Sequence, residues 1–287
     1  MTKAPFTLKA PVRQTTSVVF ASPHSGRDYP WAFLRQTVLD ERAIRSSEDA
    51  FVDLLFESAP DFGAPLLAAT APRAFIDVNR SAKELDPALI EDVRKSTHNP
   101  RVTSGLGVIP RVVANGRNIY RGKLSLDEAH VRLRDHWRPY HDRIQQLLDD
   151  THAQFGEAIL IDCHSMPHEA IDSIGTANAP HPQIVLGDRF GAAADNLIVD
   201  RIEAAFSAAG LRVARNSPFA GAFTAQHYGR PSKRQHVIQV EIDRSLYMNE
   251  RLVRPNGAFQ GFQTLMRGVI ADICDIGRTE QLPLAAE

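Results

Sequence analysis

The stretch that decides the fold is AILIDCHSMP, residues 158–167, in which an apolar run leads directly into His164. A continuous rather than alternating apolar run is typical of a strand that helices cover on both faces. A second run, SVVFASPHSG at residues 17–26, ends in the same way at His24. These runs predict an open α/β sheet, mostly parallel or mixed, with a histidine just beyond two of its strands.

Other segments extend this prediction in both directions along the chain. Apolar residues recur at three- and four-residue steps in 126–148, 194–209 and 257–276, which predicts helices that flank the sheet, the first of them bent at Pro139. Residues 1–14 lack periodicity and predict a surface arm, whereas no break in composition divides 15–287, so we expect a single catalytic domain there. Further strands are expected at APLLAAT (64–70), AFIDV (74–78), QIVLG (183–187), LRVAR (211–215) and HVIQVEI (236–242).

Composition excludes several classes of protein. With 33 basic and 34 acidic residues, the net charge of -1 provides no overall field that would recruit nucleic acid or an anionic membrane. The chain contains no apolar segment of the roughly 20 residues that a membrane span needs, and its first residues lack the apolar core of a signal peptide. We therefore expect a cytoplasmic protein. Two cysteines cannot form a disulfide framework.

The two strand-end histidines suggest a metal or substrate site. In open α/β sheets ligands bind beyond the carboxyl ends of the strands, so His24 and His164 are expected to share one crevice. Each could instead cap a backbone carbonyl in a loop. Neutral imidazoles are good ligands for Zn²⁺, and a hydrolytic zinc site commonly adds one carboxylate and leaves a position open for water.

The residues themselves leave the carboxylate ligand open among Asp28, Glu48 and Asp49. Glu48 and Asp49 follow two serines in RSSEDAFVDLL, where a serine could cap a helix and the acids would favour its dipole. That structural explanation competes with a role as a metal ligand.

Further candidates come from other predicted strands. AFIDVNR leaves its strand with Asn79 and Arg80, which could orient a substrate amide and grip a carboxylate. Glu241 lies in the apolar run HVIQVEI, where burial should raise its proton affinity as a general base requires, unless it is a structural carboxylate paired with Arg244 or Arg230.

Two stretches without periodicity are expected to face the substrate. GAFTAQHYGRP, residues 221–231, contains His227 and Arg230 between glycines. The segment from Pro87 to Lys123 is too long for an ordinary connection, and we expect it to carry substrate-binding arginines. The candidates there are Arg111, Arg117 and Arg121, and the end of another predicted strand adds Asp188 and Arg189.

One ordered set of motifs resembles the N-formylglutamate amidohydrolase family over roughly residues 17–270. The motifs are PHSG, EDAFVDLL, IDVNR, DCHSMP, LGDRFG, HYGRP and QVEIDRSLYMNE. The resemblance implies a fold of the zinc-exopeptidase type, distantly similar to zinc carboxypeptidases and aspartoacylases. Zinc carboxypeptidases, however, place an acid three residues after the first histidine, where this chain has Arg27.

The resemblance also implies roles for individual residues. The metal ligands are expected to be His24, His164 and Asp49, with Asp49 preferred to Glu48 and Asp28 as the carboxylate. Zn²⁺ is the expected ion, although another divalent metal could replace it. Asn79 and Arg80 resemble the group that binds the substrate carboxylate and the oxyanion, and Glu241 resembles the base.

The implied reaction is hydrolysis of a small N-formyl or N-acyl amino acid, most simply N-formyl-L-glutamate to formate and L-glutamate, as in histidine degradation. Two alternatives stay open at this point. One is a deacylase or carboxypeptidase-like zinc hydrolase with another N-acyl substrate. The other is a metal-free protein that binds carboxylate metabolites without catalysis.

Overall fold

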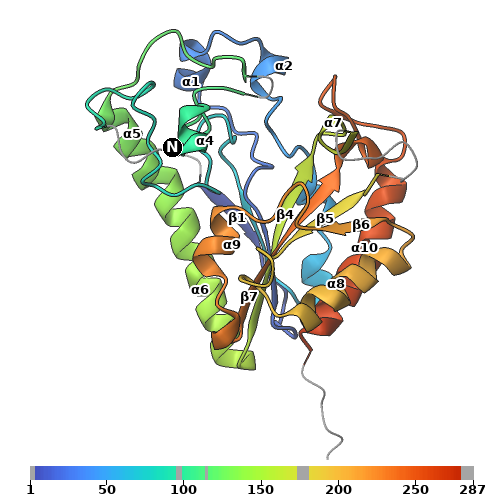
Figure 1. The fold of residues 1–287 in the computed structure, drawn as a ribbon. Helices are drawn as coiled ribbons and strands as arrows, with labels where there is room; N and C mark the ends of the chain where they lie inside the picture. Colours follow the sequence, from blue (N-terminus) through green and yellow to red (C-terminus); the bar gives the residue numbers. More distant parts are fainter. Residues whose placement is uncertain (1–3, 95–98, 114–115, 173–180, 279–287) are drawn as a thin grey trace, which may run out of the picture.

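The computed structural model describes residues 4–94, 99–113, 116–172 and 181–278. The ends of the chain, 1–3 and 279–287, and residues 95–98 and 114–115 of the predicted long loop lie outside this range. Figure 1 shows one central sheet with helices on both sides. Within the described residues, no helix is both long and apolar enough to cross a lipid bilayer.

The sheet has seven strands in the order β1-β3-β2-β4-β7-β5-β6. The strands are β1 (Phe6–Lys9), β2 (Val18–Ser22), β3 (Leu66–Ala69), β4 (Ala158–Met166), β5 (Ile184–Gly187), β6 (Val213–Arg215) and β7 (Gln235–Asp243). The pairs β2–β3, β2–β4, β4–β7 and β5–β6 are parallel, and β1–β3 and β5–β7 are antiparallel. The predicted mixed, open α/β sheet of a single domain is therefore confirmed.

Helices cover both faces of this sheet (Figure 1). On one face α3 (Val52–Leu55), the 3-10 turn Ala59–Phe62, α8 (Asn196–Ala208) and α10 (Phe259–Ile276) pack on apolar residues of the strands. On the other lie α6 (Arg138–Phe155) and α9 (Phe223–Tyr228). The remaining helices are α1 (Trp31–Gln36), α2 (Glu41–Ile44), α4 (Pro100–Thr103), α5 (Leu126–Arg132) and α7 (Glu169–Asp172), with short 3-10 turns at Pro231–Lys233 and Arg244–Leu246. A two-stranded ribbon pairs β8 (Met248–Asn249) with β9 (Arg254–Pro255).

The face of the sheet that carries α6 changes character along its strands. Ala158 and Leu160 of β4 and Val237 of β7 belong to the apolar core. The next residues of the same face, two positions apart in each strand, are polar, because side chains alternate between faces. They are Asp162 and His164 on β4, and Gln239 and Glu241 on β7. The carboxyl half of this face therefore presents polar and ionisable side chains instead of apolar core residues.

Three predictions about elements need correction. Phe6–Lys9, inside the predicted arm, forms edge strand β1, which pairs with β3. The pairing joins residues far apart in the chain, and the sequence of the arm contains no pattern that predicts it. AFIDV (74–78) forms turns rather than a strand, since its apolar side chains pack in a separate cluster beneath the long loop. The helix expected from residue 126 passes through a π-helical turn, Leu133–Trp137, just before Pro139 in the first turn of α6.

Arg132 ties α5 to this separate cluster. Its side chain is 2% exposed, lies over the Phe75 ring at 4.2 Å from the centroid, and donates hydrogen bonds to the Phe75 carbonyl and the Tyr120 hydroxyl. A buried guanidinium that satisfies backbone and side-chain oxygens in this way holds the loop segments against the helix.

We predict that Arg132→Met lowers the free energy of unfolding by about 2–4 kcal/mol, because it leaves buried oxygen atoms without donors. Urea unfolding followed by circular dichroism would measure this. Arg134→Met, on the exposed side of the same segment, is the matched control and should leave the midpoint where it is. Equal midpoints for the two variants would contradict the role given to Arg132.

Candidate active site

Residues from three adjacent strands meet at the carboxyl edge of the sheet. His24 follows β2 by two residues, and His164 lies inside β4, which runs on to Met166 rather than ending before the histidine. The ring centroids of the two histidines are 4.8 Å apart. In the parallel register of β4 and β7, His164 is the direct neighbour of Glu241, so that their side chains share one face.

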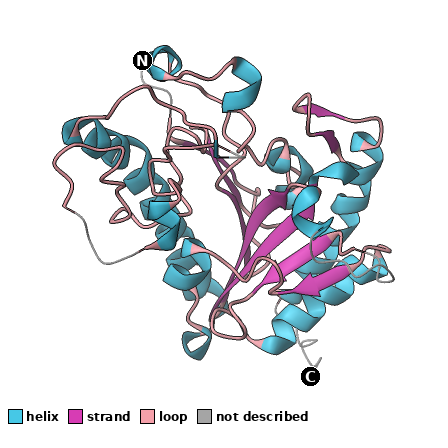
Figure 2. Cartoon of the chain, turned by 45° about the horizontal axis from the view of Figure 1, so that its top comes forward, coloured by secondary structure: helices cyan, strands magenta, loops and turns pink. Residues whose placement is uncertain are grey.

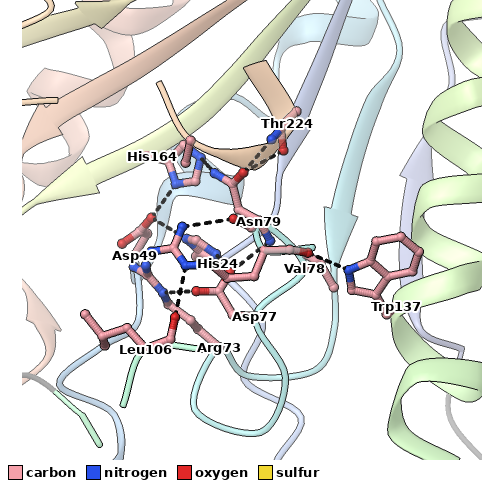
Figure 3. Close-up of polar contacts among 12 residues, drawn as sticks. His24, Asp49, Arg73, Asp77, Val78, Asn79, Leu106, Trp137, His164 and Thr224 are labelled. Atoms are coloured by element: carbon pink, nitrogen blue, oxygen red, sulfur yellow. Dashed lines mark hydrogen bonds and ion pairs between the residues drawn. The ribbon is translucent and has the colours of Figure 1, made fainter. Parts of the chain in front are cut away.

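Three ligand atoms converge between these histidines. His24, Asp49 and His164 are buried and each offers one atom that lies within 4.8 Å of the other two. The Asp49 Oδ2 atom is 2.9 Å from His164 Nδ1 and 3.4 Å from His24 Nδ1. This His24 nitrogen is buried and makes no hydrogen bond with any described residue. Figure 3 shows the three side chains pointing toward one another.

A second pair of carboxylates holds the opposite nitrogens of both imidazoles. His24 Nε2 is 2.7 Å from Asp77 Oδ1, and His164 Nε2 is 3.1 Å from Asp162 Oδ2. A carboxylate that accepts the Nε2 proton fixes the tautomer in which Nδ1 carries a lone pair, the arrangement usual around metal-bound histidines. The donor set therefore fits a divalent metal, with two nitrogens and one oxygen available.

Charge in this group is balanced between its members. Burial opposes ionisation of Asp49, but its contacts with His164 and His24 outweigh burial and lower the pKa of Asp49 well below the usual range. Burial likewise disfavours the imidazolium of His164, yet the Asp162 and Asp49 carboxylates outweigh it and raise its pKa. These opposing shifts show that the buried carboxylates require positive charge between them, which protons or a metal ion can supply.

Asp49 is held by the chain around it rather than by a helix. It lies between α2 and α3, whose amino-terminal caps are Asp40 and Phe51, so Ser46 and Ser47 cap no helix. Its backbone N–H donates to the His24 carbonyl at 3.0 Å, and its Oδ1 accepts from Arg244 Nη2 at 2.9 Å. The predicted position in a first helical turn is wrong, and the tertiary contacts orient the carboxylate instead.

The loop after Phe75 supplies Asp77, Asn79 and Arg80. The Asn79 side-chain oxygen accepts from the N–H and hydroxyl of Thr224, both at 2.8 Å, which directs its amide nitrogen toward Asp162 and His164. Figure 3 shows this contact together with the Arg73–Asp77 pair, whose Nε–Oδ2 distance is 3.0 Å. These bonds fix the loop against β4.

Helix α6 supports the same loop from behind. The Trp137 indole N–H donates to the Arg80 carbonyl at 2.8 Å. His141 Nε2 lies 2.8 Å from the Val78 carbonyl oxygen, and its Nδ1 lies 2.8 Å from the Tyr228 hydroxyl. Trp137 precedes His141 by four residues, about one helical turn, so both rings lie on the same side and can reach the loop.

The convergent group lines a cavity of about 620 Å³. Glu241 lies in its wall, 8% exposed, with Oε1 accepting from Gln239 Nε2 at 2.8 Å. Burial, more than any other effect, raises the pKa of Glu241 to about 7. A carboxylate with that pKa beside a set of metal ligands can exchange a proton with water near neutral pH.

Comparison with known proteins places the chain in a family. The profile of the N-formylglutamate amidohydrolase family matches residues 16–248. The chain belongs to this family. The chain is accordingly a hydrolase.

Individual relatives agree along nearly their whole length. The N-formylglutamate deformylase of Pseudomonas aeruginosa PAO1 is 29% identical over 248 residues, 83% of this chain and 85% of that protein. The N-formylglutamate deformylase of Pseudomonas putida is 29% identical over 242 residues, 81% and 82% of the two chains. The crystal structure of N-formylglutamate amidohydrolase from Ralstonia eutropha JMP134 superposes with a TM-score of 0.90 at 34% identity, covering 96% of this chain and 99% of that one.

Six of the residues singled out from the sequence meet in this cavity. His24, Asp49, Asn79, Arg80, His164 and Glu241 all line it. Of the other acids considered as ligands, Glu48 is bound to Arg45 and to the Tyr29 hydroxyl, and Asp28 lies outside the convergent group. Arg27, at the position where carboxypeptidases have an acid, pairs with Asp53.

Other predicted substrate contacts lie elsewhere. His227 and Arg230 are exposed on or after α9 and do not line the cavity; the ring of His227 stacks on Phe223. Burial lowers the pKa of His227. Arg111 pairs with Asp86, while Arg117 and Arg121 are exposed outside the cavity. Asp188 binds Asn216 and the Gly191 N–H, and neither it nor Arg189 belongs to the lining.

Sequence reasoning missed Asp162, Gln239, Arg73 and Arg101. Asp162 and Gln239 precede His164 and Glu241 by two residues in strands, and this spacing places them on the same face. That signal could have identified both. Arg73 and Arg101 reach the cavity from irregular segments, where spacing gives no direction.

We predict that Asp162→Asn weakens divalent-metal binding by about 10- to 100-fold, since a neutral amide oxygen is a weaker acceptor for the Nε2 proton of His164 than a carboxylate and makes the imidazole less basic as a ligand. Titration of the metal against a chelator of known affinity would measure this. Asp188→Asn is the control, because Asp188 is a buried carboxylate remote from the ligands. Unchanged affinity in Asp162→Asn would remove Asp162 from the metal centre.

We predict that His141 makes stability fall as the solution is acidified. Burial lowers its pKa to about 4, below its ordinary value of 6.5, so the unfolded chain binds a proton before the folded one does. The stability contributed by the neutral ring is then lost as pH falls from 6.5 to 4, by up to about 3 kcal/mol.

Urea unfolding at several pH values would show this as a difference between the protein and His141→Gln that narrows toward pH 4. His130→Gln, on the exposed surface of α5, is the control and should parallel the unaltered protein throughout. Parallel curves for His141→Gln as well would mean that the ring takes up a proton as readily in the folded chain as in the unfolded one.

Proposed function

We propose that the protein is a metal-dependent amidohydrolase that cleaves N-formyl-L-glutamate to formate and L-glutamate. The observation that carries this proposal is the buried convergence of His24, Asp49 and His164 beside Glu241 in one cavity. Membership of the N-formylglutamate amidohydrolase family, and relatives named N-formylglutamate deformylase, support the choice of substrate.

His24, Asp49 and His164 would hold the ion, with Nδ1 of each histidine and Oδ2 of the aspartate as ligands. Two nitrogens and one carboxylate are the ligand set of hydrolytic zinc sites, so Zn²⁺ is the ion we propose. When bound, such an ion polarises a carbonyl and lowers the pKa of water.

Glu241 acts as the general base. Its carboxylate takes a proton from the water that attacks the formyl carbon, and then delivers the proton to the leaving nitrogen as the C–N bond breaks. Glu241 lies in the cavity wall directly beside His164, and its pKa is near 7, so it can carry out both proton transfers at neutral pH. The Gln239 amide holds the carboxylate by one oxygen and leaves the other for water.

Arg80 binds a substrate carboxylate. Its Nε and Nη1 groups donate to the carbonyls of Leu106 and Asn79, which orients the guanidinium. Among the described residues none accepts from its Nη2 group, although the side chain is only 7% exposed. A buried arginine with donors to spare is suited to a planar anionic group of the ligand.

We predict that Glu241→Gln retains one bound metal per chain but loses about 10²- to 10⁴-fold in kcat on N-formyl-L-glutamate, because the amide cannot accept the proton. Formate release and elemental analysis of the same preparation would measure both quantities. His164→Ala should lose the metal and the activity together. Metal-free wild-type protein without hydrolysis would instead indicate a binding protein, and retained turnover in Glu241→Gln would exclude Glu241 as the base.

A further inference from the structure

The cavity contains more positive charge than its own carboxylates neutralise. Four arginines and three acidic residues line it within the described part of the chain. Two of these arginines have direct carboxylate partners: Arg73 pairs with Asp77, and Arg244 pairs with Asp49. The other two, Arg80 and Arg101, form no ion pair with any described residue.

These two unpaired arginines approach the cavity from different depths. Arg80 is 7% exposed and is fixed by backbone carbonyls of the loop that also carries Asn79. Arg101 is exposed and lies on α4, in the long loop that covers the cavity. Burial, more than any other effect, lowers the pKa of Arg80; the Asp77 carboxylate opposes this shift, and the positive charges of Arg73 and Arg101 add to it. Arg80 and Arg101 both line the cavity, so one ligand in it can meet both guanidinium groups.

A guanidinium that lines a cavity without a directly bound carboxylate is suited to an anionic group of a ligand. One ligand carboxylate could bind Arg80. Arg101 would then remain without an anionic partner, and a second anionic group on the same ligand could pair with it. An amino acid with an acidic side chain has two carboxylates, whereas one with a neutral side chain has a single carboxylate.

We propose that Arg101 is the residue that selects substrates with a second carboxylate, while Arg80 binds the carboxylate that all amino acid substrates share. This inference rests on the proposed hydrolysis of N-formyl amino acids and assigns the preference for an acidic side chain to one residue of the long loop. Arg111, Arg117 and Arg121, the arginines expected from the sequence, lie outside the cavity.

The test compares N-formyl-L-glutamate with N-formyl-L-glutamine, which has nearly the same shape but a neutral side chain. For Arg101→Gln, the ratio of kcat/KM values for the two substrates should fall by about 10- to 100-fold, the range expected for one lost hydrogen-bonded ion pair. Most of the fall should come from N-formyl-L-glutamate. Arg101→Lys should retain part of the preference because it keeps the charge.

Two further variants separate the roles. Arg80→Gln should reduce kcat/KM for both substrates alike and leave their ratio near that of the unaltered enzyme. Arg117→Gln, on the same loop but exposed outside the cavity, is the matched control and should change neither value. Because Arg101 and Arg117 are both exposed, circular dichroism is expected to show the same fold for all loop variants.

The inference is overturned if Arg101→Gln keeps the original ratio, if Arg80→Gln alone abolishes the preference, or if the unaltered enzyme does not distinguish the two substrates. Each of these results leaves hydrolysis of N-formyl-L-glutamate standing. An unaltered, metal-loaded enzyme that cleaves neither substrate would refute the proposed function itself, so the two failures can be told apart.

Discussion

The structure depends on keeping several charged groups buried at one edge of the sheet. Asp49, Asp77, Asp162 and the two histidines all lie almost completely out of water. Such groups are tolerable only if each charge has a partner and each polar atom a hydrogen bond. The carboxylates therefore flank both imidazoles, and arginines bind the other oxygens of Asp77 and Asp49. Asp162 Oδ1 and His24 Nδ1 are left without a hydrogen-bond partner among the described residues. Everything else in the site is arranged around this balance.

The sheet makes the arrangement possible because it holds distant parts of the chain in fixed register. β4 and β7 pair over nine residues, which sets His164 beside Glu241 and Asp162 beside Gln239. Helices α6 and α9 and the π-helical turn before α6 then fix the irregular loop that carries Asp77, Asn79 and Arg80. The contacts come from Trp137, His141 and Thr224. Figure 2 shows loops gathered beyond the ends of the strands, and residues of these loops line the cavity.

The sequence allowed the fold and half of the site to be predicted for physical reasons that can be stated. Buried strands of a covered sheet are apolar throughout, and six of the seven predicted runs are strands of the sheet. The seventh run, AFIDV, is a loop that packs on a small core, and its sequence is as apolar as that of a buried strand. Histidines at strand ends indicated the crevice. The local sequence does not predict that β1 joins the edge of the sheet or that Arg101 reaches the cavity. Nor does it predict that His227 stacks on Phe223 instead of lining the cavity.

Strands of the sheet form one side of the cavity, and a long loop forms the other. Glu241 and His164 belong to paired strands in the middle of the sheet, whereas Arg101 belongs to a four-residue helix within a long surface loop. Loops accept insertions and replacements that strands do not. Divergence within the family could therefore exchange the preferred side chain of the amino acid while the hydrolytic centre stays the same, which would let one scaffold serve a series of blocked metabolites.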